Sequence, residues 1–219
     1  MKKISKKTMT ALIDELRALA PSKPLTYGES LAVAREQAAR LREAVEATEP
    51  DIDLVWLVDQ TAVPVHFAPS HELQENASGL TTDLIGGKLQ MFINQGEPPL
   101  RQRFSLLHEF KHVLDFKDAK TLHAKLGTGD DALKHNMIEW IANEFAGQVL
   151  MPLDHVKRIW RKTGNDLALS ASFFNVSREA MRTRLEKLNF IGDFKRPRGY
   201  FRTTTLFPAA DTSQCPFAA

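Results

Sequence analysis

Apolar residues recur every three to four positions along three long stretches of this chain, the spacing that places them on one face of a helix. This spacing predicts helices over residues 8–19, 28–47 and 131–150. The buried stripe of the second helix would consist of Leu31, Ala34, Ala38, Leu41 and Val45. Pro21 and Pro24 separate the first two helices. Because this amino-terminal pair contains no chemical motif, we expect it to contribute packing.

Shorter apolar runs between these helices predict a small sheet. Val63–Phe67 alternates in character, and Pro64, which has no backbone N–H, favours an edge strand. Residues 79–85 and 88–94 flank a Gly-Gly pair, the pattern of a tight antiparallel hairpin. The polar residues 116–130 predict a loop. We expect a small, partly antiparallel sheet, to whose edge an extended peptide could add as a further strand.

The composition favours a globular protein of the cytoplasm. Of 219 residues, 43% are hydrophobic, enough for a sizeable core, yet no apolar run is long enough to span a membrane. The basic start at Met1–Lys7 does not lead into a signal peptide, because Asp14 and Glu15 interrupt the apolar region. The single cysteine, Cys215, excludes an internal disulfide and cysteine-based zinc ligation, which fits a reducing cytosol.

Positive charge is concentrated toward the carboxyl end. Residues 157–202 carry 12 Lys and Arg against four Asp and Glu, whereas residues 8–156 carry 13 against 22. This end is therefore the more suitable one for a polyanion or an acidic partner. Beyond it, residues 203–219 predict a poorly ordered tail.

Within the basic region, residues 165–191 predict two helices joined by a short turn, with Ser177 capping the second helix. Its inner face would consist of Ala180, Met181, Leu185 and Leu188. The arginines expected to project outward are Arg178, Arg182 and Arg184. The pattern is typical of a helix-turn-helix that contacts DNA through its second helix. The alternative is a helical pair that covers the core and exposes Arg for solubility or docking.

Candidate chemistry lies in the sequence His108-Glu109-Phe110-Lys111-His112. Residues four apart lie on one helix face, so His108 and His112 can both direct an imidazole toward one metal ion. Glu109 lies about 100° round the helix and borders the same face. Two such His with Glu after the first is the zinc-protease pattern of two ligands and a general base. The alternative is a pair of ordinary core or surface His.

Catalytic zinc usually takes a third protein ligand. The candidates by residue type are Asp118, His123, His135 and Glu139. Asp118 has metzincin-like spacing, but that pattern requires Gly where this chain has Asp115. Glu139 lies on a predicted helix beside Ala142 and Ala146, small residues that allow two helices to approach closely. Spacing alone leaves Glu139 open between ligand and ordinary helix residue.

Two stretches, residues 103–112 and 139–152, together resemble the ImmA/IrrE-type metallopeptidases. That family joins a zinc-protease helix to a later helix of the form Glu-x-x-Ala-Asn-x-Phe-Ala, followed by Leu-Met-Pro. The resemblance implies a zincin-like α+β fold, mostly helical, with the small sheet before the active-site helix and a carboxyl-terminal helix-turn-helix-like unit. The zinc ligands it implies are His108, His112 and Glu139. Lys111 departs from the family, where Gly is common, and could affect substrate access or point to solvent.

The motif assigns Glu109 as the general base that activates a zinc-bound water. Asn143 and Asp115 are candidates for hydrogen bonds to the ligands. Further candidates, as stabilisers of the oxyanion, are His123, His135 and Tyr200. We expect amino-terminal helices over 1–49, a peptidase core over 50–155, the basic helical unit over 156–202 and the tail over 203–219.

The resemblance further implies an intracellular zinc metallopeptidase that cleaves a specific regulatory protein. The expected substrate is a transcriptional repressor in a bacterial stress response or mobile-element switch. Some relatives carry a fused DNA-binding domain, whereas this chain begins with plain helices and resembles a stand-alone form that acts on a separate partner. The alternative is a non-catalytic, DNA-associated or antitoxin-like regulator with a structural or inactive zinc site, contacting DNA through residues 165–191.

Overall fold

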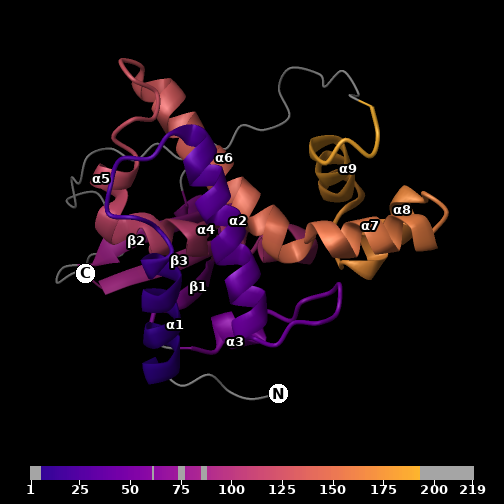
Figure 1. Ribbon diagram of the computed structural model, residues 1–219. Coiled ribbons are helices and arrows are strands. Elements are labelled where there is room, and N and C mark those ends of the chain that lie inside the picture. The colour runs from indigo at the N-terminus through magenta and orange to yellow at the C-terminus, as the bar shows by residue number, and fades with distance from the viewer. Residues whose placement is uncertain (1–5, 61, 74–76, 85–87, 193–219) are drawn as a thin grey trace.

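The computed structural model describes residues 6–60, 62–73, 77–84 and 88–192 (Figure 1). In chain order its elements are α1 (Lys6–Ala18), α2 (Tyr27–Ala44), α3 (Val55–Val58), β1 (Val65–Ala68), η1 (Ser70–Glu72), β2 (Gly79–Leu84), β3 (Lys88–Asn94), α4 (Pro99–Asp115), η2 (Phe116–Asp118), α5 (Ala119–Leu122), α6 (Asp131–Leu150), α7 (Leu153–Lys162), α8 (Leu167–Phe173) and α9 (Arg178–Lys187). The predicted α+β class, mostly helical with a small sheet, is confirmed.

The sheet has three strands in the order β1-β3-β2 within the described ranges. β1 runs parallel to β3, with Val65 opposite Met91, and β2 runs antiparallel to β3, with Gly79 opposite Ile93. The partly antiparallel sheet is therefore confirmed, and so is the edge position that Pro64 predicts for β1. The glycine pair expected to form the hairpin turn lies outside the described residues.

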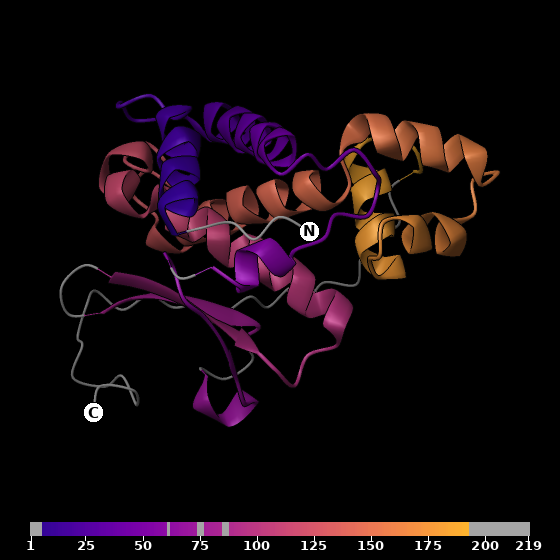
Figure 2. The same cartoon turned by 90° about the horizontal axis from the view of Figure 1, so that it is seen from below.

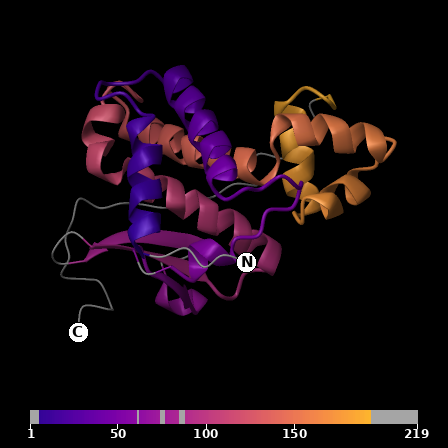
Figure 3. The ribbon, with the colours of Figure 1, turned by 60° about the horizontal axis from the view of Figure 1, so that its bottom comes forward.

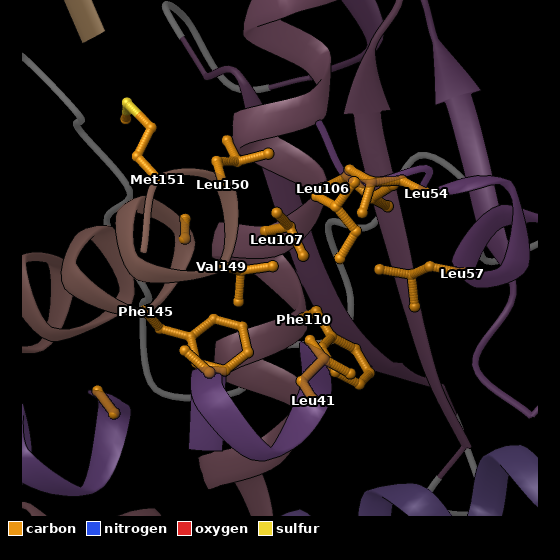
Figure 4. Packing of buried hydrophobic residues seen from close by; sticks show 14 of the residues in the cluster. Leu41, Leu54, Leu57, Leu106, Leu107, Phe110, Phe145, Val149, Leu150 and Met151 are labelled. Carbon is orange, nitrogen blue, oxygen red and sulfur yellow. The ribbon is translucent and has the colours of Figure 1, made fainter. Parts of the chain in front are cut away.

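Helix α4 lies between the sheet and the other helices, as Figure 2 shows. It contacts β2 and β3 on one side and α6 on the other, and α6 in turn packs against α2. The fully buried Phe110 of α4 meets Phe145 of α6, with ring centroids 6.4 Å apart (Figure 4). The centroid of the Trp56 ring of α3 lies 6.5 Å from that of Phe110. These two contacts between aromatic rings stabilise the packing of α4 against α6 and α3.

Element bounds follow the apolar periodicity closely. α6 covers the predicted residues 131–150, and α1 and α2 end a little earlier than predicted. The loop expected over 116–130 was partly wrong, because the chain continues from α4 into η2 and α5. Buried Leu122 and Leu126 anchor this segment to the rest of the protein. None of the helices in the described part of the chain combines the length and apolarity of a membrane span.

Helices α7, α8 and α9 form a group to one side of the remaining elements in every view (Figures 1 and 3). As predicted, Ser177 caps α9, since its hydroxyl accepts a hydrogen bond from the N–H of Ala180 at 3.1 Å. Met181 and Leu185 are fully buried on the expected inner face. The predicted residues 203–219 lie outside the described ranges.

The outward position expected for Arg184 is wrong. Arg184 is only 3% exposed, and its Nε donates to the backbone oxygen of Met151 at 3.0 Å. Its guanidinium also lies 3.4 Å from a carboxylate oxygen of Glu144 on α6. Arg184 follows Met181 by three residues, so it shares the inner face, and the buried carboxylate compensates its charge. Arg178 is exposed, as expected, and Arg182 is partly buried.

We predict that Phe110→Ala lowers the free energy of unfolding by about 3–5 kcal/mol, because it removes a fully buried ring that contacts both Phe145 and Trp56. The matched control is Phe116→Ala, at a ring that is 44% exposed, for which we expect a loss of about 0.5 kcal/mol or less. Chemical denaturation measures both. Equal losses for the two variants would contradict the central position assigned to Phe110.

Candidate metal centre

Helix α4 brings the two histidines of the motif together. His108 and His112 lie one turn apart, with ring centroids 4.8 Å apart and ring planes at 73°. Their Nε2 atoms are 3.1 Å from each other. Both rings therefore turn the same nitrogen toward one point, as the four-residue spacing predicts.

Helix α6 supplies a carboxylate to the same point. Glu139 Oε2 lies 3.2 Å from His108 Nε2, and Glu139 Oε1 lies 3.4 Å from His112 Nε2. The carboxylate reaches this position because α6 packs closely on α4 beside the buried Ala142 and Ala146. His108, His112 and Glu139 form a cluster whose ligand atoms lie within 4.8 Å of one another.

The donor set fits a divalent metal ion. Zinc held tetrahedrally at about 2.0–2.2 Å would separate its ligand atoms by roughly 3.3–3.6 Å. The separations of 3.1, 3.2 and 3.4 Å in the cluster are close to that spacing. Two imidazoles and one carboxylate suit zinc and other first-row transition metals. The cluster is thus compatible with a metal ion.

The electrostatics of the cluster favour positive charge at its centre. Burial alone would raise the pKa of Glu139, but hydrogen bonds and attraction from His108 and His112 outweigh burial and hold this pKa well below its usual range. Burial likewise opposes the protonated form of His112, yet the contact with Glu139 raises the pKa of this ring above its ordinary value. A buried carboxylate between two imidazoles therefore stabilises a cation.

Asn143 contacts the His108 ring, in agreement with the hydrogen bond predicted for it. It lies one turn after Glu139 on α6, and its Oδ1 is 3.0 Å from His108 Nδ1. Since an amide oxygen only accepts, Nδ1 donates its proton to Asn143, and this hydrogen bond directs Nε2 toward the cluster.

Asp115 and Lys111 belong to a buried polar chain outside the cluster. Lys111 is 3% exposed, and its Nζ donates to Gln37 at 2.8 Å and to Asp115 at 2.5 Å. His123 Nε2 lies 3.4 Å from the other Asp115 oxygen. Burial opposes ionisation of Asp115, but Lys111 and His123 lower its pKa to about 2. The Lys111 side chain therefore does not point to solvent, and the Asp115 carboxylate pairs with Lys111 and His123.

The other sequence candidates lie elsewhere. Asp118 is exposed and His123 pairs with Asp115, so neither joins the metal cluster. His135 lies one turn before Glu139 and is not part of the cluster, although its Nε2 is buried. Tyr200 lies outside the described residues.

Glu109 is 3% exposed and points toward strand β2. The hydroxyl of Thr81 lies 2.8 Å from Glu109 Oε2 and 3.1 Å from the backbone oxygen of Glu109. A Cβ on Gly79 would lie only 2.9 Å from Glu109 Cγ, so glycine leaves room for the carboxylate. Sequence reasoning missed Thr81 and Gly79, because only the packing of β2 on α4 brings them to Glu109.

Comparisons with known proteins give a matching family and a similar fold. The family model Peptidase_M78, described as an IrrE N-terminal-like domain, matches residues 58–186, a range that contains the whole cluster. Comparison with curated proteins gives no match. Among solved structures, a Mycobacterium tuberculosis transcriptional regulator is similar, with a TM-score of 0.56 and 19% identity over 84% of this chain. The chain spans 52% of that regulator, and the likeness concerns the fold.

We predict that Glu139→Ala weakens the retention of bound zinc, because it removes one of the three proposed ligands. Asn143→Ala should weaken zinc binding roughly 10–100-fold, because the His108 ring loses the hydrogen bond that orients it. Metal analysis after dialysis against a mild chelator measures both. Asn136→Ala, at an exposed amide of the same helix, is the control and should retain metal like the wild type. Full retention by Glu139→Ala would exclude it as a ligand.

Proposed function

The chain belongs to the family described by the IrrE N-terminal-like domain model, and on that premise we propose that it is a zinc metallopeptidase of the HExxH type. The observation that carries this proposal is the convergence of Glu139, from a separate helix, on the two histidines of the motif. A clustering of three ligand residues with an adjacent carboxylate is what hydrolysis by a metal-bound water requires.

In this proposal His108, His112 and Glu139 hold zinc, and Asn143 orients His108. When bound, zinc would supply a Lewis acid and a water whose pKa is lowered to roughly 7. Glu109 accepts the proton of the attacking water on its carboxylate and returns it to the leaving amine, a role worth about 10²–10⁴ in rate. Thr81 holds one oxygen of that carboxylate, which leaves the other to accept the proton.

The proposed substrate is a regulatory protein, in particular a transcriptional repressor of a bacterial stress or mobile-element switch. This choice rests on the family resemblance, because no described residue identifies a cleavage sequence. The peptidase core would extend over 50–155, preceded by the helices of 1–49, and the basic helical unit over 156–202 would dock the substrate or its DNA.

A second candidate is a non-catalytic regulator that contacts DNA. It is favoured by the basic unit and by the name of the similar structure, a transcriptional regulator. The proposed contact uses residues 165–191, with Arg178 and Arg182 toward the DNA. Since Arg184 is buried against Glu144, it is excluded from that surface.

We predict that Glu109→Gln retains zinc but abolishes peptide cleavage, since an amide cannot accept the proton. The variant also serves as a trap: it should capture the substrate from a lysate of the source organism without cutting it. The wild type should then cleave the captured protein in a reaction that a chelator inhibits. The control variant Glu36→Gln, changed at an exposed position, should cleave it as the wild type does. Cleavage by Glu109→Gln at the wild-type rate would refute its role. Salt-sensitive DNA binding without any cleavage would favour the second candidate.

We predict that Thr81→Val lowers the kcat for the captured substrate while metal content and KM stay unchanged, because Glu109 loses its hydroxyl partner. Gly79→Ala should displace the carboxylate, and a misplacement of this kind costs roughly a hundredfold in rate. Thr81→Ser should restore activity, and Thr82→Val, on the other face of β2, is the control. Equal activity of Thr81→Val and Thr82→Val would contradict the positioning role.

A further inference from the structure

A cavity of about 680 Å³ lies between the carboxyl-terminal helices and the rest of the protein. Its walls come from α2, α6, α7 and α9, and none of its lining residues belongs to the metal cluster. Helix α6 contributes three residues to the cavity wall: Trp140, Glu144 and Gln148. Each of them comes directly after a residue on the helix face that carries Glu139. They therefore lie about 100° round the helix from that face. Its volume is in the range of small-molecule sites.

One wall of the cavity is aromatic and accessible. Trp140 is 46% exposed, the largest side chain among the exposed hydrophobic residues of the described chain. The ring of Tyr27 meets it edge-on, with centroids 6.2 Å apart, and holds the indole in place. An exposed indole in the wall of a cavity offers a flat surface on which a planar group can stack.

The charged residues that line the cavity are mostly cationic. Four of them, Arg35, Lys157, Arg184 and Lys187, accompany a single carboxylate, Glu144. Arg35 Nε, Arg184 Nη1 and Lys187 Nζ lie 2.9, 3.4 and 3.7 Å from Glu144. Counting Asp154, which lies 3.8 Å from Lys157, two carboxylates accompany the four cations, and this excess of positive charge attracts anions.

Only some of the cations that line the cavity attach the carboxyl-terminal helices to the rest of the protein. Arg184 is buried, and its contact with Glu144 joins α9 to α6. The Arg35 side chain, in contrast, is 54% exposed although it contacts Glu144. The Lys157 side chain is 48% exposed and lies 3.8 Å from Asp154, which is itself 93% exposed. Arg35 and Lys157 thus present charge at the opening, where Trp140 presents its ring.

We propose that this cavity binds a small organic anion in which a planar ring is joined to an acidic group, the chemistry shared by nucleotides and aromatic carboxylates. The ring stacks on Trp140, and the acidic group pairs with Arg35 and Lys157. An uncharged ring would not use the exposed charges of Arg35 and Lys157, and an inorganic anion would leave the indole in water. Binding of this kind does not depend on peptidase activity.

The test uses the full chain and the fluorescent probe 1-anilinonaphthalene-8-sulfonate, which joins fused rings to a sulfonate. We expect saturable binding at one site, displaced by AMP or by 1-naphthoate; which of the two competes better distinguishes a nucleotide from an aromatic carboxylate. Trp140→Ala and Lys157→Gln should each raise the Kd by about tenfold or more. The controls Phe116→Ala and Lys120→Gln, at exposed positions away from the cavity, should leave the Kd unchanged.

Three results would overturn the proposal. Equally tight binding of the uncharged N-phenyl-1-naphthylamine would identify a plain apolar surface. Binding that persists in both Trp140→Ala and Lys157→Gln would place the site elsewhere. If the fluorescent probe, AMP and 1-naphthoate all fail to bind saturably, the cations that line the cavity serve only to attach α9. All positions changed are exposed, so each variant should fold, which its circular dichroism spectrum verifies.

Discussion

The structure depends on placing the Glu139 carboxylate, 2% exposed, between two imidazoles. Burying a carboxylate costs several kcal/mol unless partners compensate it. Compensation here requires α4 and α6 to approach closely, which the small Ala142 and Ala146 allow and which the contact of Phe110 with Phe145 stabilises. The hydrophobic core and the candidate metal centre are therefore built at one helix interface, and a change in the packing of either helix moves the clustered side chains.

Helix α4 is also fixed from three other directions by polar contacts. Thr81 of the sheet holds Glu109, and Gln37 of α2 accepts a hydrogen bond from Lys111 at 2.8 Å. Arg17 of α1 donates to the carbonyl oxygens of Val113 and Leu114, at 2.8 and 3.1 Å, near the end of the helix. Buried hydrogen bonds of this kind specify one position better than apolar contacts alone. They hold the helix that carries both clustered histidines from three sides.

What the sequence predicts depends on how local each feature is. The pairing of His108 with His112 follows from helix geometry alone, and the bounds of α6 follow from its apolar spacing. Glu139 needed the family resemblance, because its approach is set by packing between helices. Thr81 could not be found, since the contact depends on how the sheet rests on α4. The outward position predicted for Arg184 is wrong, because its charge is compensated by Glu144 of another helix, and no local pattern in the sequence indicates that contact.

Helix α6 connects two regions with different chemistry. One face carries Glu139 and Asn143 toward α4, and the neighbouring face carries Trp140 and Glu144 toward the carboxyl-terminal helices. Burial would raise the pKa of Glu144, but Arg35, Arg184 and the nearby Lys187 lower it, so the carboxylate stays charged. Glu139 and Glu144 are about 7.5 Å apart along the helix axis, within one rigid element. A tilt of α6 large enough to change its contacts with α9 would therefore also change the distance from Glu139 to the histidines.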